Sequence, residues 1–168
     1  MSVVSGIEER ESARRIALEL LEVRDRSVKE IRQRLHRRGC KPAAIDTVVG
    51  DLEALRLLDD RAFVRRWVES RRSRRPEGAP KISRDLARRG IDPALIEEVL
   101  AEYGDDLGSG AEALTLLRRQ LTRYRGLDPE TARRRMYGLL ARRGFDPDTV
   151  REAVTRAWTE IEEAGEKR

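Results

Sequence analysis

Leu86-Ala-Arg-Arg-Gly90-Ile-Asp-Pro93 stands in the middle of a 168-residue chain that repeats the same pattern on either side. The other copies are Leu35-His-Arg-Arg-Gly39-Cys-Lys-Pro42 and Leu140-Ala-Arg-Arg-Gly144-Phe-Asp-Pro147. All three read Leu-x-Arg-Arg-Gly-x-x-Pro, and their glycines lie 51 and 54 residues apart. A pattern that recurs at this period is the signature of stacked supersecondary units. We therefore expect a repeat protein.

Alignment of the three copies on their glycines shows that the similarity reaches well beyond the motif. Apolar residues recur 4, 8 and 23 positions before the glycine and 10 positions after it. The four columns are Leu35, Leu86 and Leu140; Ile31, Ile82 and Met136; Ile16, Trp67 and Leu121; and Val49, Leu100 and Val154. Each copy of the motif therefore belongs to a larger unit with buried side chains of its own.

The apolar residues follow a helical period of 3.6 along the chain, and no segment alternates as a strand does. Ser27-x-x-Glu30 and Ser109-x-x-Glu112 are capping boxes. Asp-Pro steps place an N-cap acceptor before a first-turn proline, and the three motif glycines supply the left-handed residue that ends a helix. Together these signals predict nine helices, at residues 8–24, 28–38, 42–56, 60–74, 80–89, 93–103, 110–124, 129–143 and 147–163.

Grouped in threes, these helices form repeats at residues 8–58, 59–104 and 109–163. The predicted fold class is therefore all-α, with three tandem three-helix repeats forming an elongated, curved helical array. The linkers differ in character. Residues 72–80 are basic and contain two prolines and a glycine, whereas residues 104–110 are acidic and glycine-rich and are a candidate hinge.

Charged residues make up 40% of the chain and aromatic residues 4%, which argues against one thick core. The net charge is +5, and 32 of the 36 basic residues are arginine, whose planar fork grips phosphate or carboxylate. The charge alternates in blocks. Residues 61–89 hold 11 basic and 3 acidic side chains, residues 90–117 hold 7 acidic and no basic ones, and residues 118–143 hold 9 basic and 2 acidic ones. This pattern suits a polyanion or an acidic protein as partner.

The best functional candidate is the cationic run Arg71, Arg72, Arg74 and Arg75, followed by Lys81. Clustered like charges repel one another and call for a counter-charge, although a solvated helix end is the alternative. The paired arginines of the motif are further candidates for binding a partner or DNA: Arg37, Arg38, Arg88, Arg89, Arg142 and Arg143. Because one arginine would serve the helix dipole, the pairs leave structural and binding roles open.

Other distinctive residues favour structural roles. Trp67 could stack on a nucleic-acid base, but its alignment with Ile16 and Leu121 favours a place in the core. Trp158 has no apolar counterpart at its offset, which leaves its exposure open. Asp59-Asp60 stands where the first helix of the second repeat needs an N-cap.

His36 and Cys40 each occur once, too few for a metal site and without an obvious catalytic partner. The chain has neither a phosphate-binding glycine loop nor a nucleophile elbow. We therefore expect no catalysis, no metal and no cofactor. A single cysteine fits a reducing compartment, and no apolar run is long enough to cross a membrane. These features predict a cytoplasmic protein without membrane contact, with a monomer as the default.

One region resembles a known family. Leu57-Leu-Asp-Asp60-Arg-Ala-Phe63-Val-Arg-Arg-Trp67-Val-Glu-Ser-Arg71, followed by Gly78 and Ile82-Ser-Arg-Asp-Leu86-Ala-Arg-Arg-Gly90-Ile91, is similar to the RecX family of bacterial recombination regulators. Arg26-Ser27-x-x-Glu30-Ile31-x-x-x-Leu35-x-x-x-Gly39 also fits. The first copy departs from the pattern at Cys40-Lys41, where the other copies carry an apolar residue and Asp.

The resemblance implies a partner that composition and spacing do not. Members of this family bind the RecA recombinase, chiefly its filament on single-stranded DNA, and suppress its ATPase and strand exchange. Many also bind DNA directly, and the family fold is three tandem three-helix repeats. We therefore expect a non-catalytic inhibitor of RecA. The alternatives are a direct arginine-rich DNA-binding protein without a dedicated protein target, and a generic helical-repeat scaffold for acidic proteins.

Overall fold

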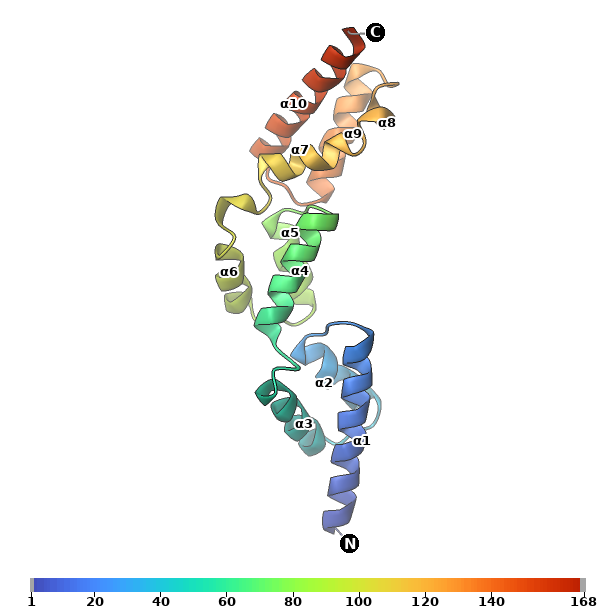
Figure 1. Cartoon of the computed structure of the whole chain (residues 1–168), viewed down its shortest axis with the longest axis vertical. Coiled ribbons are helices and arrows are strands. Elements are labelled where there is room, and N and C mark those ends of the chain that lie inside the picture. The colour runs from blue at the N-terminus through green and yellow to red at the C-terminus, as the bar shows by residue number, and fades with distance from the viewer. Residues whose placement is uncertain (1, 167–168) are drawn as a thin grey trace. The chain divides into compact units, whose positions relative to one another are not determined.

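The computed structural model describes residues 2–166, and within that range it contains helices and no strand, which confirms the all-α prediction. Figure 1 shows the elements in chain order. They are α1 (Ser2–Val23), α2 (Val28–Arg37), α3 (Pro42–Ala54), α4 (Asp60–Arg74), α5 (Ala79–Arg88), α6 (Pro93–Ala101), the 3₁₀ helix η1 (Gly104–Asp106), α7 (Gly110–Arg118), α8 (Leu121–Tyr124), α9 (Pro129–Arg142) and α10 (Pro147–Glu166).

The chain divides into two compact units, which are described separately. The first unit runs through Arg66 and includes Leu86–Ile96, and the second comprises Trp67–Asp85 and the residues from Glu97 onward. The division passes through α4, α5 and α6, so the middle of the chain contributes to both units.

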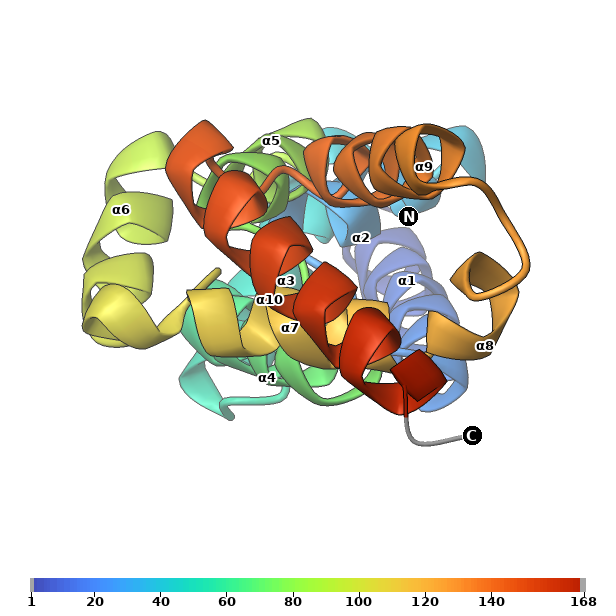
Figure 2. The ribbon, with the colours of Figure 1, turned by 90° about the horizontal axis from the view of Figure 1, so that it is seen from above.

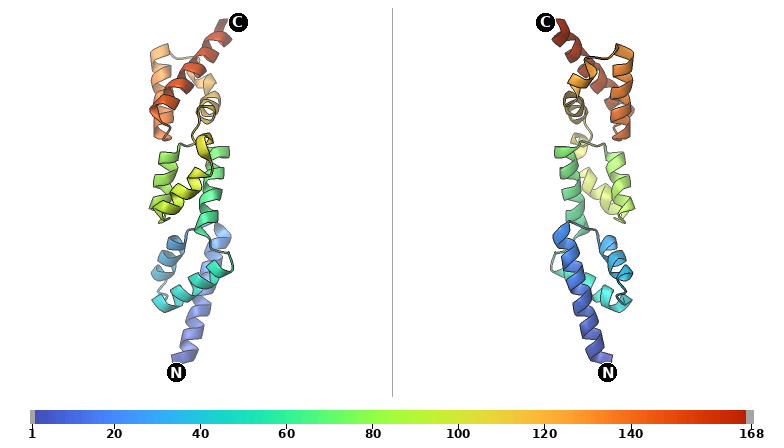
Figure 3. Two further views of the ribbon diagram at one scale, coloured as in Figure 1. Left: turned by 90° about the vertical axis from the view of Figure 1, so that its left-hand side faces the viewer. Right: turned by 90° about the vertical axis from the view of Figure 1, so that its right-hand side faces the viewer.

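The core of the first unit lies among α1, α2 and α3, which pack on one another. Its buried side chains are Ala13, Ala17, Ile31, Leu35, Ile45, Val48, Val49, Leu52 and Leu58. The N-terminal turns of α1 extend past α2 and α3 (Figure 3). Short residues on α1 and branched residues on α3 therefore let three helices close around the motif leucine, Leu35.

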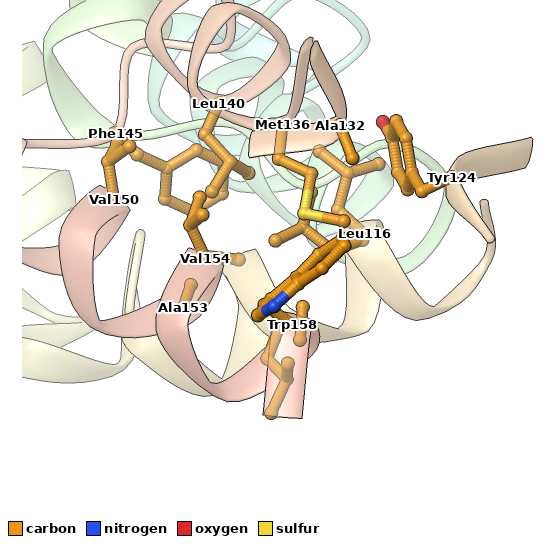
Figure 4. Close-up of a cluster of buried hydrophobic side chains, with 14 of the residues drawn as sticks. Leu116, Tyr124, Ala132, Met136, Leu140, Phe145, Val150, Ala153, Val154 and Trp158 are labelled. Atoms are coloured by element: carbon orange, nitrogen blue, oxygen red, sulfur yellow. The ribbon is translucent and has the colours of Figure 1, made fainter. Parts of the chain in front are cut away.

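The second unit has a core among α7, α9 and α10, with α10 crossing α7 (Figure 2). Met136, Leu140, Phe145, Val154 and Trp158 converge in its centre (Figure 4). Trp158 is 7% exposed, so the exposure that its alignment left open does not occur. Its indole Nε1 donates to Glu162 at 2.5 Å, and this hydrogen bond lets a polar ring atom lie in an apolar core.

The motif glycines adopt the left-handed conformation that the sequence predicts, with φ of 81° at Gly39 and 76° at Gly144. After each of them the backbone N–H of the next residue returns to the motif leucine, from Cys40 to Leu35 at 3.1 Å and from Phe145 to Leu140 at 3.3 Å. These are Schellman helix ends. The Leu–Gly spacing of the motif therefore closes a helix.

The helix starts follow the capping signals with one difference. Ser27 and Glu30 form the predicted capping box. Ser109 accepts from the backbone N–H of Glu112 at 3.4 Å, but the Glu112 carboxylate turns away to Gly108 N and to Arg72. The second capping box is thus half formed, because its glutamate serves a tertiary ion pair instead.

The structure departs most from the predicted helices and linkers at three places. The first helix begins at Ser2 rather than residue 8. The candidate hinge at residues 104–110 holds η1. The predicted helix at residues 110–124 is broken between α7 and α8, where Gln120 has φ −127° and ψ 8°. No glycine or proline marks this break, and it lies beside Arg119, whose side chain reaches the end of α4.

Candidate functional site

A buried glutamate stands inside the predicted cationic segment 71–81. Glu77 is 5% exposed, and three cations surround its carboxylate: Arg71 Nε at 3.4 Å, Lys81 Nζ at 3.3 Å and Arg143 Nη1 at 3.4 Å. A buried carboxylate is tolerated only when opposite charges repay its lost hydration. Three of the predicted binding residues therefore supply the counter-charge of one internal anion.

The backbone around Glu77 is tied to the end of α9. Gly78 N donates to the carbonyl oxygen of Arg143 at 2.9 Å, and a Cβ added to Gly78 would lie 2.0 Å from the carbonyl oxygen of Gly144. Only glycine fits this close approach of two backbones. The proline- and glycine-containing segment is therefore a packed junction with the third repeat.

Arg72 is also engaged within the second unit. Its Nε donates to Glu112 Oε1 at 2.6 Å, and its guanidinium lies 5.7 Å from the centroid of the Tyr103 ring. The hydrogen bond to Glu112 is the main cause that raises the pKa of Arg72 above its ordinary value. The same Glu112 carboxylate accepts from Gly108 N at 2.9 Å, so Arg72 helps to hold the 104–110 segment against α4.

Arg74 and Arg75 differ from these residues because both are exposed at the end of α4. Arg119 is exposed beside them, and its Nη1 and Nη2 donate to the carbonyl oxygens of Arg74 at 3.0 Å and Ser73 at 3.3 Å. Arg119 thereby satisfies two carbonyls that α4 leaves unpaired at its C-terminus. We call Arg74, Arg75 and Arg119 the exposed arginine surface.

A junction of the same kind lies within the first unit. Ser27 Oγ donates to the carbonyl oxygen of Arg89 at 2.6 Å, and Arg89 Nη1 lies 2.8 Å from Glu30 Oε1. A Cβ added to Gly90 would lie 1.9 Å from Lys29 Cδ. The N-terminus of α2 therefore packs directly on the motif turn that follows α5.

Glu30 is held as a carboxylate at this junction. Burial alone would raise the pKa of Glu30, but the hydrogen bond and charge of Arg24, the Ser27 N–H and the charge of Arg89 outweigh it, and the pKa lies below its ordinary value. The pKa of Asp60 is instead raised, chiefly by burial. Asp60 Oδ1 accepts from Val28 N at 2.9 Å, so it caps α2 rather than its own helix.

Asp59 performs the capping that the sequence predicted for the Asp59-Asp60 step, since its Oδ1 accepts from Ala62 N at 2.9 Å. Asp59 therefore caps α4, and Asp60 caps α2. Arg66 Nε also contacts Asp25 Oδ2 at 2.6 Å from the same helix. The chain between α1 and α2 is therefore held by α4.

The paired arginines of the motif divide by position. In the second and third copies the second arginine serves a junction, because Arg89 pairs with Glu30 and Arg143 with Glu77 while their carbonyls accept from the preceding repeat. In the first copy both arginines are exposed, as are the first arginines of the other copies. These exposed residues are Arg37, Arg38, Arg88 and Arg142.

The remaining features are Trp67, a candidate for base stacking, and any cluster of metal-ligating side chains. Trp67 is half-buried, and the guanidinium of Arg71 lies 4.3 Å from its ring centroid. No group of three or more His, Cys, Asp or Glu side chains among the described residues could hold a metal ion. Across residues 2–166, no helix has the length and apolar character needed to cross a membrane.

The sequence alone did not indicate which acidic residues neutralise the predicted arginines, nor that Arg119 lies beside them. Glu30, Glu77 and Glu112 neutralise the predicted arginines, and Arg119 joins Arg74 from far along the chain. The sequence did contain a sign of the role of Glu77, because it is the only acidic residue from Arg71 to Lys81. Nothing in the sequence indicated the role of Arg119, because that role depends on a contact between residues 45 positions apart.

Three family models match the chain one after another. The first three-helix domain of RecX matches residues 13–52, the second matches residues 59–100 and the third matches residues 111–154.

Curated relatives match over most of their length. The chain is 36% identical over 139 residues to the regulatory protein RecX of Chlorobium phaeobacteroides strain BS1, covering 83% of this chain and 89% of the relative. It is 33% identical over 156 residues to the regulatory protein RecX of Streptomyces coelicolor, covering 93% and 81%. The crystal structure of RecX from Lactobacillus salivarius has the same fold, with a TM-score of 0.75, 21% identity, and coverage of 90% of this chain and 97% of that one.

Proposed function

Because the chain belongs to the RecX family of regulatory proteins, we propose that it binds the RecA recombinase, chiefly its filament on single-stranded DNA. In this proposal it inhibits the RecA ATPase and strand exchange. It acts in the cytoplasm, as a monomer, and contributes no catalysis of its own.

The exposed arginine surface supports the proposal and indicates which residues make the contact. Arg71, Arg72 and Lys81 are engaged by Glu77, Glu112 and Asp85, whereas Arg74 and Arg75 are exposed. An exposed guanidinium can form two parallel hydrogen bonds to a carboxylate or a phosphate. A recombinase filament on DNA offers both, so this surface is where we place the contact with the filament.

Inhibition requires that the protein bind one state of the filament better than another. A ligand shifts an equilibrium only by the difference in its affinity for the two states. We propose that contacts from more than one repeat favour a filament state that does not turn over ATP. Arg37, Arg38, Arg88 and Arg142 are exposed residues of the motif that can add such contacts.

The test is the rate of ATP hydrolysis by RecA on single-stranded DNA, measured as the full-length protein is titrated in. The proposal predicts that hydrolysis falls with added protein while the filament remains on DNA or shortens. Unchanged hydrolysis at saturating protein, with a folded sample confirmed by circular dichroism, would contradict it.

The second candidate function is direct binding of nucleic acid, which the exposed arginine surface also suits because phosphate attracts guanidinium groups whatever the partner. A salt titration separates the two. Binding to naked single-stranded DNA with a steep dependence on salt, and no gain in affinity when RecA coats the strand, would favour the second candidate. A clear gain on the coated strand supports the regulator.

A further inference from the structure

A groove lies between α2 and α3 in the first repeat. Its volume is about 420 Å³. Pro42 and Ile45 line it from α3, and Gln33 and Arg37 line it from α2. A groove of this size accepts one or two apolar side chains of a partner.

The third repeat has a groove at the same place, between α9 and α10, with a volume of about 540 Å³. Pro147 and Val150 line it three and six residues after Gly144, as Pro42 and Ile45 do after Gly39. The groove therefore occurs at the helix pair that the motif joins in both the first and the third copies.

The two grooves differ in charge. The first is edged by Arg32, Arg37 and His36, with Asp46 as its one acidic lining residue. At the positions of Arg32, Gln33 and His36 the third repeat has Tyr137, Gly138 and Ala141, and at the position of Asp46 it has Arg151, which pairs with Asp148. Arg32 bonds to Asp46 across the groove, whereas Arg37 is exposed and no ion pair is formed by it among the described residues. The groove of the first repeat therefore combines an apolar lining with an exposed cation, Arg37, at its edge.

We propose that this groove binds an acidic segment of a partner protein, with an apolar side chain between α2 and α3 and a carboxylate on Arg37. An apolar anchor flanked by acidic residues matches both the lining and the charge of the edge. A peptide suits the groove better than nucleic acid, because a peptide can bury an apolar side chain against Pro42 and Ile45 whereas a phosphate backbone offers none. The groove shares no residue with the exposed arginine surface.

The experiment uses the full chain and a synthetic probe, so its result does not depend on RecA. The probe is an amphipathic peptide of leucine and glutamate, about 15 residues long, so that it can present one apolar face. Backbone amide NMR shifts locate its binding, and fluorescence anisotropy of a labelled copy measures its affinity. A peptide with lysine in place of glutamate and a thymidine oligonucleotide are compared at the same salt.

The proposal predicts shifts centred on residues 32–46 and affinity for the glutamate peptide above that for the lysine peptide. Arg37→Glu should lower the affinity about tenfold, since an attraction becomes a repulsion. Gln33→Trp, which places a large ring in the groove at an exposed position, should abolish the shifts. Arg34→Glu reverses a charge on the same helix outside the lining and should leave the affinity unchanged.

Three results would overturn the proposal. Equal binding of the lysine peptide would remove the preference for acid. Shifts that survive both Arg37→Glu and Gln33→Trp would place the peptide elsewhere. Stronger shifts of the same amides by the oligonucleotide would make the groove a nucleic-acid site.

Discussion

Replacing Glu77 with glutamine tests whether the cationic segment is held together from inside. The substitution keeps the shape of the side chain and removes its charge, leaving Arg71, Lys81 and Arg143 around a neutral amide. Their exposures are 27%, 25% and 17%, so none can reach bulk water fully without moving. We expect the packed junction around Gly78 to loosen.

The size of the effect follows from the distances. At 3.4 Å and an effective dielectric constant of about 20, one ion pair is worth about 5 kcal/mol before hydration is counted. Hydration of the partly exposed cations recovers much of this, and breaking a buried pair costs about 3–5 kcal/mol in measured cases. The contacts of 3.3–3.4 Å are longer than ideal charge-assisted hydrogen bonds. We therefore predict that Glu77→Gln lowers the free energy of unfolding by about 3 kcal/mol.

Urea unfolding followed by circular dichroism measures this loss. A double-mutant cycle with Arg143→Gln isolates the coupling between Glu77 and Arg143, which should be about 1 kcal/mol or more because the residues are in contact. A loss below about 0.5 kcal/mol for Glu77→Gln, the size of an ordinary surface substitution, would refute the internal counter-charge.

Three further substitutions probe the scaffold. Gly78→Ala should destabilise by about 3 kcal/mol in urea unfolding because its Cβ would overlap the carbonyl oxygen of Gly144. The control Gly126→Ala adds a methyl group in open space and should change stability by less than about 0.5 kcal/mol. Equal effects of the two substitutions would contradict the close approach of the two backbones. Trp158→Ala should cost about 3–5 kcal/mol in the same assay, as expected for a buried aromatic ring, and a cost under about 1 kcal/mol would mean that the ring is not in the core. The pKa of Glu30 lies below its ordinary value of 4.5, so its contribution to stability is complete above pH 4.5 and is lost as the pH falls through the lower pKa of the folded state. Glu30→Gln should therefore lower stability at pH 7 and flatten the loss of stability below pH 4.5; an unchanged profile of stability against pH would count against this role.

Local signals in the sequence predicted most of the helices because their ends are written in a few residues. Gly39, Gly90 and Gly144 end helices in the left-handed conformation, and Ser27, Asp128 and Asp146 cap the helices that follow them. The break at Gln120 was missed because it follows a long-range contact of Arg119 rather than a local breaker.

The candidate site was harder to predict for a physical reason. A run of like charges indicates that counter-charges are needed, but it does not say where they lie. For Arg71, Arg72 and Lys81 they lie within the same unit, on Glu77 and Glu112. Because these three cations have partners inside the unit, we predict that Arg74 and Arg75 are the residues of the cationic run that contact a partner.

The test of this prediction is inhibition of the RecA ATPase on single-stranded DNA by the Arg74→Gln/Arg75→Gln double variant. Its matched control is Arg14→Gln/Arg15→Gln, an adjacent pair of exposed arginines on α1. We predict that both variants keep the helicity and urea midpoint of the parent chain. The Arg74/Arg75 variant should need at least about ten times more protein for half-inhibition, because two charge-assisted hydrogen-bonding groups are lost, and the control should match the parent. Full inhibition by the folded Arg74/Arg75 variant at the parent concentration would contradict the account.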